Sequence, residues 1–254
     1  MKEKSSPDLM QRLAELLTEL KLKTAAADLG PGLLKAGGKD VLALVVDVFA
    51  IEARERSDRR VERLRRASRL PDGKTLETLE QKRLPAPLTH KLHELAAGQW
   101  VEQAANVLAF GLPGVGKTHV GCALGHALIE RGYSVLFTPT FRLVQELLAA
   151  KRDLKLPAAL RRLDMFDVLI LDDIGYVQQA PEEVEVLFTL MAERYERRSM
   201  LITSNLVFSE WDRIFKNPMT TAAAIDRLVH HSVILEFNVP SYRTKNATAR
   251  QPSK

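Results

Sequence analysis

The sequence is short of cysteine and of long apolar runs. Cys122 is the only cysteine among 254 residues, so no disulfide can form within the chain, and a reducing cytoplasm is the expected setting. The longest apolar stretch, residues 41–51, is too short to span a bilayer and is interrupted by Asp47. The opening residues, MKEKSSPD, lack the apolar segment of a signal peptide. We therefore expect a cytoplasmic protein without a membrane partner.

The chain also lacks internal repeats and low-complexity tracts. Hydrophobic residues make up 46% and charged residues 27%, which argues against a disordered or fibrous protein. The net charge is +5, and the excess lies in residues 1–100, which hold 19 Lys and Arg against 15 Asp and Glu. The length suits one substantial domain with a small appendage.

Two helical patterns occupy the beginning of the chain. Ser6 is the expected N-cap of the first helix, and Pro7 its first residue. A glycine-bearing break over residues 30–40 precedes a second helical pattern over residues 41–68. We expect an all-helical N-terminal domain at residues 1–69. Residues 70–100 should form a linker, rich in proline up to residue 88, and a leading helix.

From Asn106 onward, short apolar runs alternate with helical stretches. The five runs are NVLAF, YSVLFT, DVLIL, SMLIT and SVILEF. Strands alternating with helices predict an α/β fold, with a parallel five-stranded sheet between helices. We assign residues 101–245 to this domain and residues 246–254 to a tail.

Residues 111–118, GLPGVGKT, match the phosphate-loop pattern G-x-x-x-x-G-K-S/T without a mismatch. Glycine lets backbone N–H groups close around phosphates, and a helix expected to begin at Thr118 adds the attraction of its positive end. Lys117 would neutralise phosphate charge, and Thr118 would offer its hydroxyl to Mg²⁺. The predicted nucleotide contacts are Gly111, Pro113, Gly114, Val115, Gly116, Lys117, Thr118 and His119.

Polar residues follow the third and fourth apolar runs. Asp172 stands where an acid commonly holds the magnesium shell, and Asp173 where many P-loop ATPases have the acid that activates the attacking water. A solvated pair of turn aspartates is the alternative. The next run ends in TSN, and its polar groups could orient that water or be ordinary turn residues.

Two further features concern arginine and histidine. Arg227, on an expected helix, could act as an arginine finger in a neighbouring subunit or form a salt bridge within the chain. His90 and His93 are three residues apart, and His230 and His231 are adjacent, but no cysteine or acidic cluster completes a metal set. Zinc is therefore not expected.

These motifs together resemble the AAA+ ATPases of the DnaA/DnaC branch and, within it, the IstB-like ATP-binding proteins, which are transposition helpers encoded beside a transposase in certain insertion sequences. The stretches that carry the resemblance are GLPGVGKTH, DVLILDDIGY, LMAERYERRSMLITSN, FSEWDRIF, AIDRLVHHSVILEF and SYRTK. The N-terminal stretch IEARERSDRRVERLRRASRLPDGKTLETL also resembles this family, so the similarity covers almost the whole chain.

The resemblance implies ATP and Mg²⁺ as cofactors, ATP-dependent assembly, binding of duplex DNA, and cooperation with the transposase of the same element. By position, it implies that Lys117 and Thr118 form the Walker A pair and that Asp172 and Asp173 form the Walker B pair. It also implies sensor I at Asn205, an arginine finger at Arg227 and a possible sensor II at Arg243. The chain ends soon after Arg243, so a C-terminal helical lid is expected to be missing. AAA+ proteins usually have Glu where this chain has Asp173, and the shorter side chain makes slow hydrolysis plausible.

Two basic segments are candidate DNA contacts. The first is a stripe on one helix face, formed by Arg56, Arg59, Arg60 and Arg63. Glutamates four residues before several arginines also suit a merely solvated helix. The second segment supplies Arg142, Lys151, Arg152, Arg161 and Arg162. Contacts of this kind go to phosphates, so binding should tolerate sequence changes and weaken with salt.

Our leading hypothesis is an ATPase that oligomerises head to tail and grips or bends duplex DNA for a transposase. Head-to-tail contacts produce a ring or a helical filament. A DnaC-like helicase loader is the main alternative. A small-molecule kinase is disfavoured because no acceptor site or lid arginines are evident, and an ATP-switched scaffold without hydrolysis is a further alternative.

Overall fold

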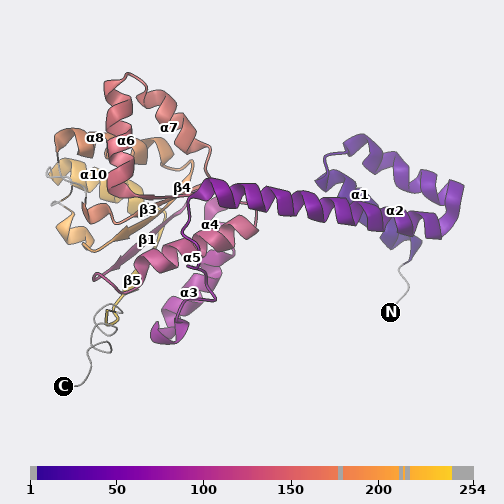
Figure 1. Ribbon diagram of the computed structural model, residues 1–254, viewed down its shortest axis with the longest axis horizontal. Coiled ribbons are helices and arrows are strands. Elements are labelled where there is room, and N and C mark those ends of the chain that lie inside the picture. Colours follow the sequence, from indigo (N-terminus) through magenta and orange to yellow (C-terminus); the bar gives the residue numbers. More distant parts are fainter. Residues whose placement is uncertain (1–4, 177–179, 212–213, 215–217, 242–254) are drawn as a thin grey trace. The chain divides into compact units, whose positions relative to one another are not determined.

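The computed structural model describes residues 5–176, 180–211, 214 and 218–241 (Figure 1). Contacts divide the chain into two compact units, Met1–Arg63 and Leu64–Lys254, and each is considered by itself. None of the helices in the described part is both long enough and apolar enough to cross a membrane.

The first unit contains α1 (Ser6–Glu19) and most of α2 (Lys23–Ser68). Ser5, not Ser6, is the N-cap of α1. Its hydroxyl accepts a hydrogen bond from the Asp8 N–H, and the Asp8 carboxylate accepts one from the Ser5 N–H. This reciprocal cap satisfies two donors at once, which explains why the helix begins one residue earlier than expected. Leucines of α1 pack against Leu42, Val46 and Ala53 of α2.

The expected break over residues 30–40 is reduced to a single position. Only Gly38, with φ of 69°, departs from helical geometry, and Pro31 lies within a helical stretch. A proline inside a helix costs about 3 kcal/mol. Packing of Leu29, Leu33 and Leu34 against the leucine cluster offsets that cost, which the sequence pattern alone could not reveal.

The second unit is built on a parallel five-stranded sheet in the order β2-β3-β4-β1-β5. The strands are β1 (Asn106–Gly111), β2 (Val135–Pro139), β3 (Val168–Asp172), β4 (Ser199–Ser204) and β5 (Ser232–Phe237). Helices cover both faces, so the strands are nearly continuous apolar runs rather than alternating ones. The predicted α/β fold class is confirmed.

The two faces of the sheet are covered by different helices (Figure 1). One face packs against α5 (Lys117–Glu130), with α3 (Ala86–Ala96) outside it. The other face belongs to an apolar cluster that includes residues of α6 (Thr140–Arg152), α8 (Pro181–Arg194) and α10 (Pro218–Val229), with α7 (Leu156–Asp164) beside them. Cys122 is buried within α5, and burial raises the pKa of its thiol to about 12, so it is a core residue.

Short elements are also found in the described part of the second unit. They are α4 (Gln99–Glu102) and the 3-10 turns η1 (Gln81–Arg83), η2 (Ile174–Tyr176) and η3 (Phe208–Glu210). The stretch expected as a linker up to residue 88 is therefore shorter, because α3 already begins at Ala86. Pro87 is accommodated in the first turn of α3, where a missing N–H removes no helical hydrogen bond.

Candidate functional site

The phosphate loop lies between β1 and α5, at the carboxyl edge of the sheet. Gly114 and Gly116 have φ of 83° and 101°, a left-handed conformation that glycine adopts without strain. Val115, between them, is fully buried and anchors the loop. The helix begins at Lys117, one residue before the expected start. Backbone N–H groups at this helix start can receive an anion.

Lys117 is held inside the loop. Its side chain is almost fully buried, and its ammonium donates hydrogen bonds to the carbonyl oxygens of Gly111 (2.7 Å) and Leu112 (3.0 Å). A buried ammonium beside a glycine-lined turn is suited to phosphate oxygens.

A carboxylate and two hydroxyls meet next to this lysine. The Oδ1 atom of Asp172 accepts hydrogen bonds from Thr118 Oγ1 (2.9 Å) and Thr203 Oγ1 (2.8 Å). These residues come from β3, α5 and β4, which converge because parallel strands end at the same edge. Carboxylate and hydroxyl oxygens are the ligands that Mg²⁺ prefers, so the residues present fit this ion.

Asp173 lies beside Asp172 with an unusual backbone. Its φ is 57°, and its N–H donates to Thr203 Oγ1 (2.8 Å). Burial raises the pKa of Asp173, and the charge of Lys117 acts in the opposite direction. Its Oδ1 atom is buried without a hydrogen-bond partner among the described residues. A partly desolvated carboxylate in a pocket is the type of group that accepts a proton in catalysis.

Asn205 and Asp173 both lie close to Gly175. A Cβ atom added at Gly175 would clash with Asn205 Oδ1 and would lie 3.5 Å from Asp173 Oδ1. Asn205 Oδ1 is also buried without a hydrogen-bond partner in the described part of the chain. The two acceptors therefore flank the same glycine on η2.

One cavity of about 610 Å³ brings most of the predicted site together. The predicted residues that line it are Pro113, Gly114, Gly116, Lys117, Thr118, His119, Asp172 and Asp173. Thr203, from the TSN strand end, is also in its wall. Asn205 is not among the residues that line it.

Part of the cavity wall was not predicted from the sequence. Four residues from the segment between α2 and α3 line it, namely Lys74, Thr78, Leu79 and Glu80. Thr78 Oγ1 lies 3.2 Å from His119 Nε2, which also lies 3.2 Å from the Thr75 carbonyl oxygen, so this segment is tied to α5. Pro139 and Phe141, at the start of α6, complete the wall. No motif marks these positions in the sequence.

Arg227 lies outside this cavity in its own chain. Its guanidinium carbon is 4.7 Å from the centroid of the Phe188 ring, and its Nη1 atom is buried without a hydrogen-bond partner among the described residues. No ion pair of Arg227 is found within those residues, so the salt-bridge alternative gains no support there. Arg243 and residues 246–254 lie outside the described part of the chain.

The first basic stripe is exposed but partly paired. Arg56 pairs with Glu52 (2.8 Å), and Arg59 pairs with Glu52 (3.4 Å) and Glu55 (3.7 Å). The four predicted arginines nevertheless share a hollow with Lys21, beside the end of α1. This hollow carries a surplus of positive charge, because Glu19 is its only acidic lining residue among those described.

The second basic segment lies on α6 and α7. Lys151 pairs with Glu185 (2.5 Å), and Arg152 with Asp153 (3.5 Å). Arg142, Arg161 and Arg162 are exposed, and no ion pair is found for them within the described ranges. Three of the five predicted cations are therefore available to a partner.

The sheet order, the phosphate loop and the acidic strand end define a P-loop protein of the AAA+ class. Among solved structures, DnaI aligns with a TM-score of 0.56 and 19% identity, over 67% of this chain and 96% of that one. DnaA bound to AMPPCP and single-stranded DNA aligns with a TM-score of 0.57 and 17% identity, over 68% and 52%. At such identities the likeness concerns the fold alone.

Sequence comparison then identifies the family. The sequence model of the family described as IstB-like ATP binding protein matches residues 12–250, so the chain belongs to this family. An insertion-sequence ATP-binding protein of Sinorhizobium fredii is 45% identical over 240 residues, which cover 93% of this chain and 80% of that protein. The IS21 ATP-binding protein of Pseudomonas aeruginosa is 37% identical over 238 residues, covering 93% and 90%. The resemblance inferred from the motifs is confirmed.

Proposed function

We propose that this protein is an ATPase that assembles head to tail on duplex DNA and assists the transposase encoded by the same insertion sequence. The observation that carries the proposal is the convergence of Lys117, Thr118, Asp172 and Asp173 in one cavity of a chain of the IstB-like family. The insertion-sequence relatives support the transposition role, and the absence of a membrane-type helix among the described residues is compatible with action in the cytoplasm.

Nucleotide binding uses groups that the loop already holds in position. The loop N–H groups and the α5 start receive the phosphates, and Lys117 Nζ exchanges the carbonyls of Gly111 and Leu112 for phosphate oxygens. Thr118 and Asp172 would hold Mg²⁺, which would neutralise part of the phosphate charge. The wall formed by residues 74–80 covers the remainder of the nucleotide.

Hydrolysis needs a proton acceptor and a positioned water. In this scheme the water oxygen bonds to the γ-phosphorus while the bond to the β,γ-bridging oxygen breaks and ADP leaves. Asp173 accepts the water proton, and the Asn205 side-chain oxygen, buried beside it, orients the water. The reach of Asp173 is one methylene shorter than that of glutamate, so the turnover is slow.

Assembly and DNA binding use other surfaces. Arg227 leaves the Phe188 ring and reaches the γ-phosphate in the neighbouring subunit, which makes assembly depend on ATP. Phosphates of duplex DNA are contacted by the exposed arginines of α6 and α7 and by the stripe of α2.

The test compares assembly of the intact protein and of Lys117→Ala on duplex DNA, with and without ATP, by sedimentation. We expect ATP-dependent oligomers on DNA for the intact protein and none for the variant, because the variant loses the cation that binds the phosphates. Lys91→Ala, an exposed lysine on α3, is the matched control and should assemble normally. Undiminished assembly of Lys117→Ala would count against the proposal.

A helicase loader is the second candidate, because DnaI and the DnaC helicase loader share the fold. Competition between duplex and single-stranded DNA in the presence of ATP separates the two functions. A transposition helper should retain the duplex, whereas a loader should prefer the single strand and bind a hexameric helicase.

A further inference from the structure

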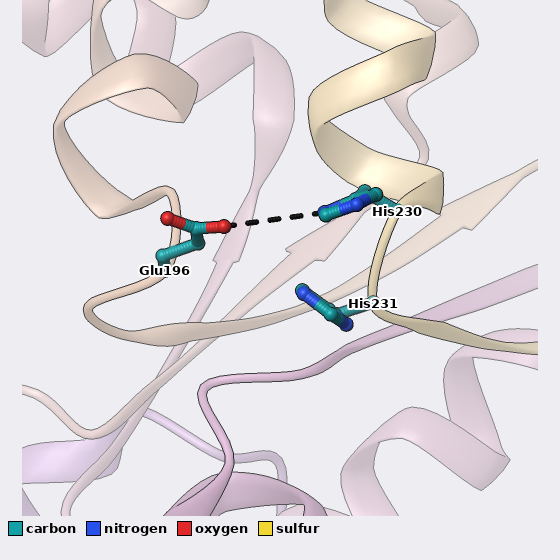
Figure 2. Close-up of side chains that lie close together, drawn as sticks. All are labelled: Glu196, His230 and His231. Atoms are coloured by element: carbon teal, nitrogen blue, oxygen red, sulfur yellow. Dashed lines mark ion pairs between the residues drawn. The ribbon is translucent and has the colours of Figure 1, made fainter.

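A second group of ligand-type side chains lies at the edge of the sheet opposite the nucleotide cavity. Glu196 lies in the turn between α8 and β4, and His230 and His231 connect α10 to β5 (Figure 2). Both strands flank β1 and run parallel to it, so their first residues meet at the amino edge of the sheet. Asp172 and the phosphate loop lie at the carboxyl edge. The two sites are therefore separate.

The three side chains are close enough to share one ion. One ligand atom from each lies within 4.8 Å of the other two. His230 Nδ1 is 4.0 Å from Glu196 Oε1, and the centroids of the two imidazole rings are 4.2 Å apart. Figure 2 shows the Glu196 carboxylate directed at His230, with the ring of His231 drawn below that of His230. Ligand atoms around a tetrahedral zinc, with bonds of about 2.0 to 2.2 Å, are about 3.4 Å apart. Small rotations of exposed side chains close that difference.

Hydrogen bonds hold the backbone of the two histidines in place. The His230 N–H donates to the Asp226 carbonyl oxygen (3.0 Å), and the Asn106 N–H donates to that of His231 (2.7 Å). Tyr195 Oη lies 3.1 Å from His230 Nδ1, and this contact is given up when that nitrogen binds an ion.

We propose that Glu196, His230 and His231 bind a divalent transition-metal ion of the zinc type, with the remaining position open to water. Two imidazoles and one carboxylate suit Zn²⁺, Co²⁺, Ni²⁺ or Cu²⁺, whereas Mg²⁺ and Ca²⁺ prefer oxygen ligands alone. This ion is distinct from the Mg²⁺ of the nucleotide site. The sequence analysis did not expect zinc, because it did not foresee that the turn after α8 brings Glu196 beside the two histidines.

The position of the site gives the ion a structural consequence. It joins the turn after α8 to the end of α10, and α10 carries Arg227 over Phe188 of α8. A bound ion therefore restrains the helix pair that holds this arginine. The restraint adds cross-links at the end of α10 without altering the nucleotide cavity.

The test uses the full chain without an affinity tag, freed of metal by a chelator. Binding of CoCl₂ is followed by visible absorption and that of ZnCl₂ by calorimetry. We expect one ion per chain at this site. Glu196→Gln and His231→Ala should each weaken binding by about 10-fold or more, since even residues outside the ligand set typically contribute 10- to 100-fold. Zinc should raise the melting temperature of the intact chain but not of these variants.

Two controls make the assignment specific. His90→Ala/His93→Ala removes the other exposed histidine pair, which includes the His90–Glu94 contact, and should leave metal binding unchanged. Lys117→Ala should also bind the metal normally, which separates this site from the nucleotide site. Metal affinity that is unaffected by Glu196→Gln and His231→Ala, or no binding of Co²⁺ and Zn²⁺ by the intact chain, would overturn the proposal.

Discussion

Asp173 is the residue at which backbone geometry and chemistry are most closely linked. A left-handed φ of 57° is uncommon for a residue with a Cβ atom, and the hydrogen bond to Thr203 holds it. The conformation places Asp173 in the wall of the cavity that Asp172 and Lys117 also line. Strain of this kind is maintained where the surrounding structure requires a particular side-chain position.

Asp173→Asn should bind ATP and assemble but lose turnover. The amide keeps the size of the side chain and cannot accept the water proton, so hydrolysis should fall by about 100-fold or more. Phosphate release under single-turnover conditions measures the loss, and Asp153→Asn, an exposed aspartate, is the control. Unchanged phosphate release would assign the proton to another group.

The raised pKa of Asp173 predicts two effects of pH. Hydrolysis should decline as the pH falls through this pKa, at a higher pH than for an ordinary aspartate, because only the carboxylate accepts a proton. A carboxyl group whose pKa is raised by folding stabilises the fold when protonated, and this contribution is lost as the pH rises through the folded-state pKa. Asp173→Asn should therefore melt higher than the intact protein at neutral pH. The difference should shrink in acid, and thermal melts across pH test it.

At the scale of elements, Arg194 connects the end of α8 to its neighbours. Its side chain is 1% exposed, and its guanidinium donates to the carbonyl oxygens of Leu163, Phe166, Asp167 and Ser199. Burial lowers the pKa of Arg194 to about 10, so it remains charged at neutral pH. One buried cation thus joins α7, α8, the turn before β3, and β4.

Arg194→Met should destabilise the second unit. The substitution leaves buried carbonyl oxygens without donors, and each unsatisfied group costs about 1 to 3 kcal/mol. We therefore expect the free energy of unfolding, measured in urea, to fall by at least about 2 kcal/mol. Arg197→Ala is the matched control, because Arg197 is exposed and its ion pair with Asp164 should contribute at most about 1 kcal/mol. Equal losses of unfolding free energy in the two variants would refute the larger contribution of the buried arginine.

The exposed arginines of α7 allow the DNA surface to be tested. Arg161→Ala/Arg162→Ala should weaken duplex binding for all sequences and reduce the slope of log K against log salt by about 2, at about 1 per phosphate contact. Arg131→Ala, which follows α5 on the opposite face of the sheet, is the control. Fluorescence anisotropy over a salt series gives the slopes, and an unaltered slope would place the DNA elsewhere.

At the scale of the whole molecule, the nucleotide site is incomplete if hydrolysis requires an arginine finger, since Arg227 does not line its own cavity. Arg227→Ala should therefore leave nucleotide binding by the monomer intact and abolish both assembly and turnover. Sizing with ATP and duplex DNA, together with nucleotide titration, measures the two effects.

Phe188→Leu is a matched variant for this experiment, because it removes the ring beneath Arg227 and keeps the arginine. It should retain assembly. Loss of nucleotide binding in Arg227→Ala would instead indicate that the arginine supports the fold of α8 and α10.

The sequence by itself determined the phosphate loop, the five strands and the family, because each rests on residues that are contiguous or regularly spaced. The proximity of Asp172 and Thr118 could be predicted, because in a parallel sheet the P-loop and the carboxyl ends of the strands lie at the same edge. The tertiary structure alone decided that residues 74–80 close the cavity and that Glu196 stands beside His230 and His231. It also decided that the helix continues past Pro31, because packing of the neighbouring leucines stabilises it. Local patterns record neighbours along the chain, whereas these contacts join segments that only the folded sheet and its helices bring together.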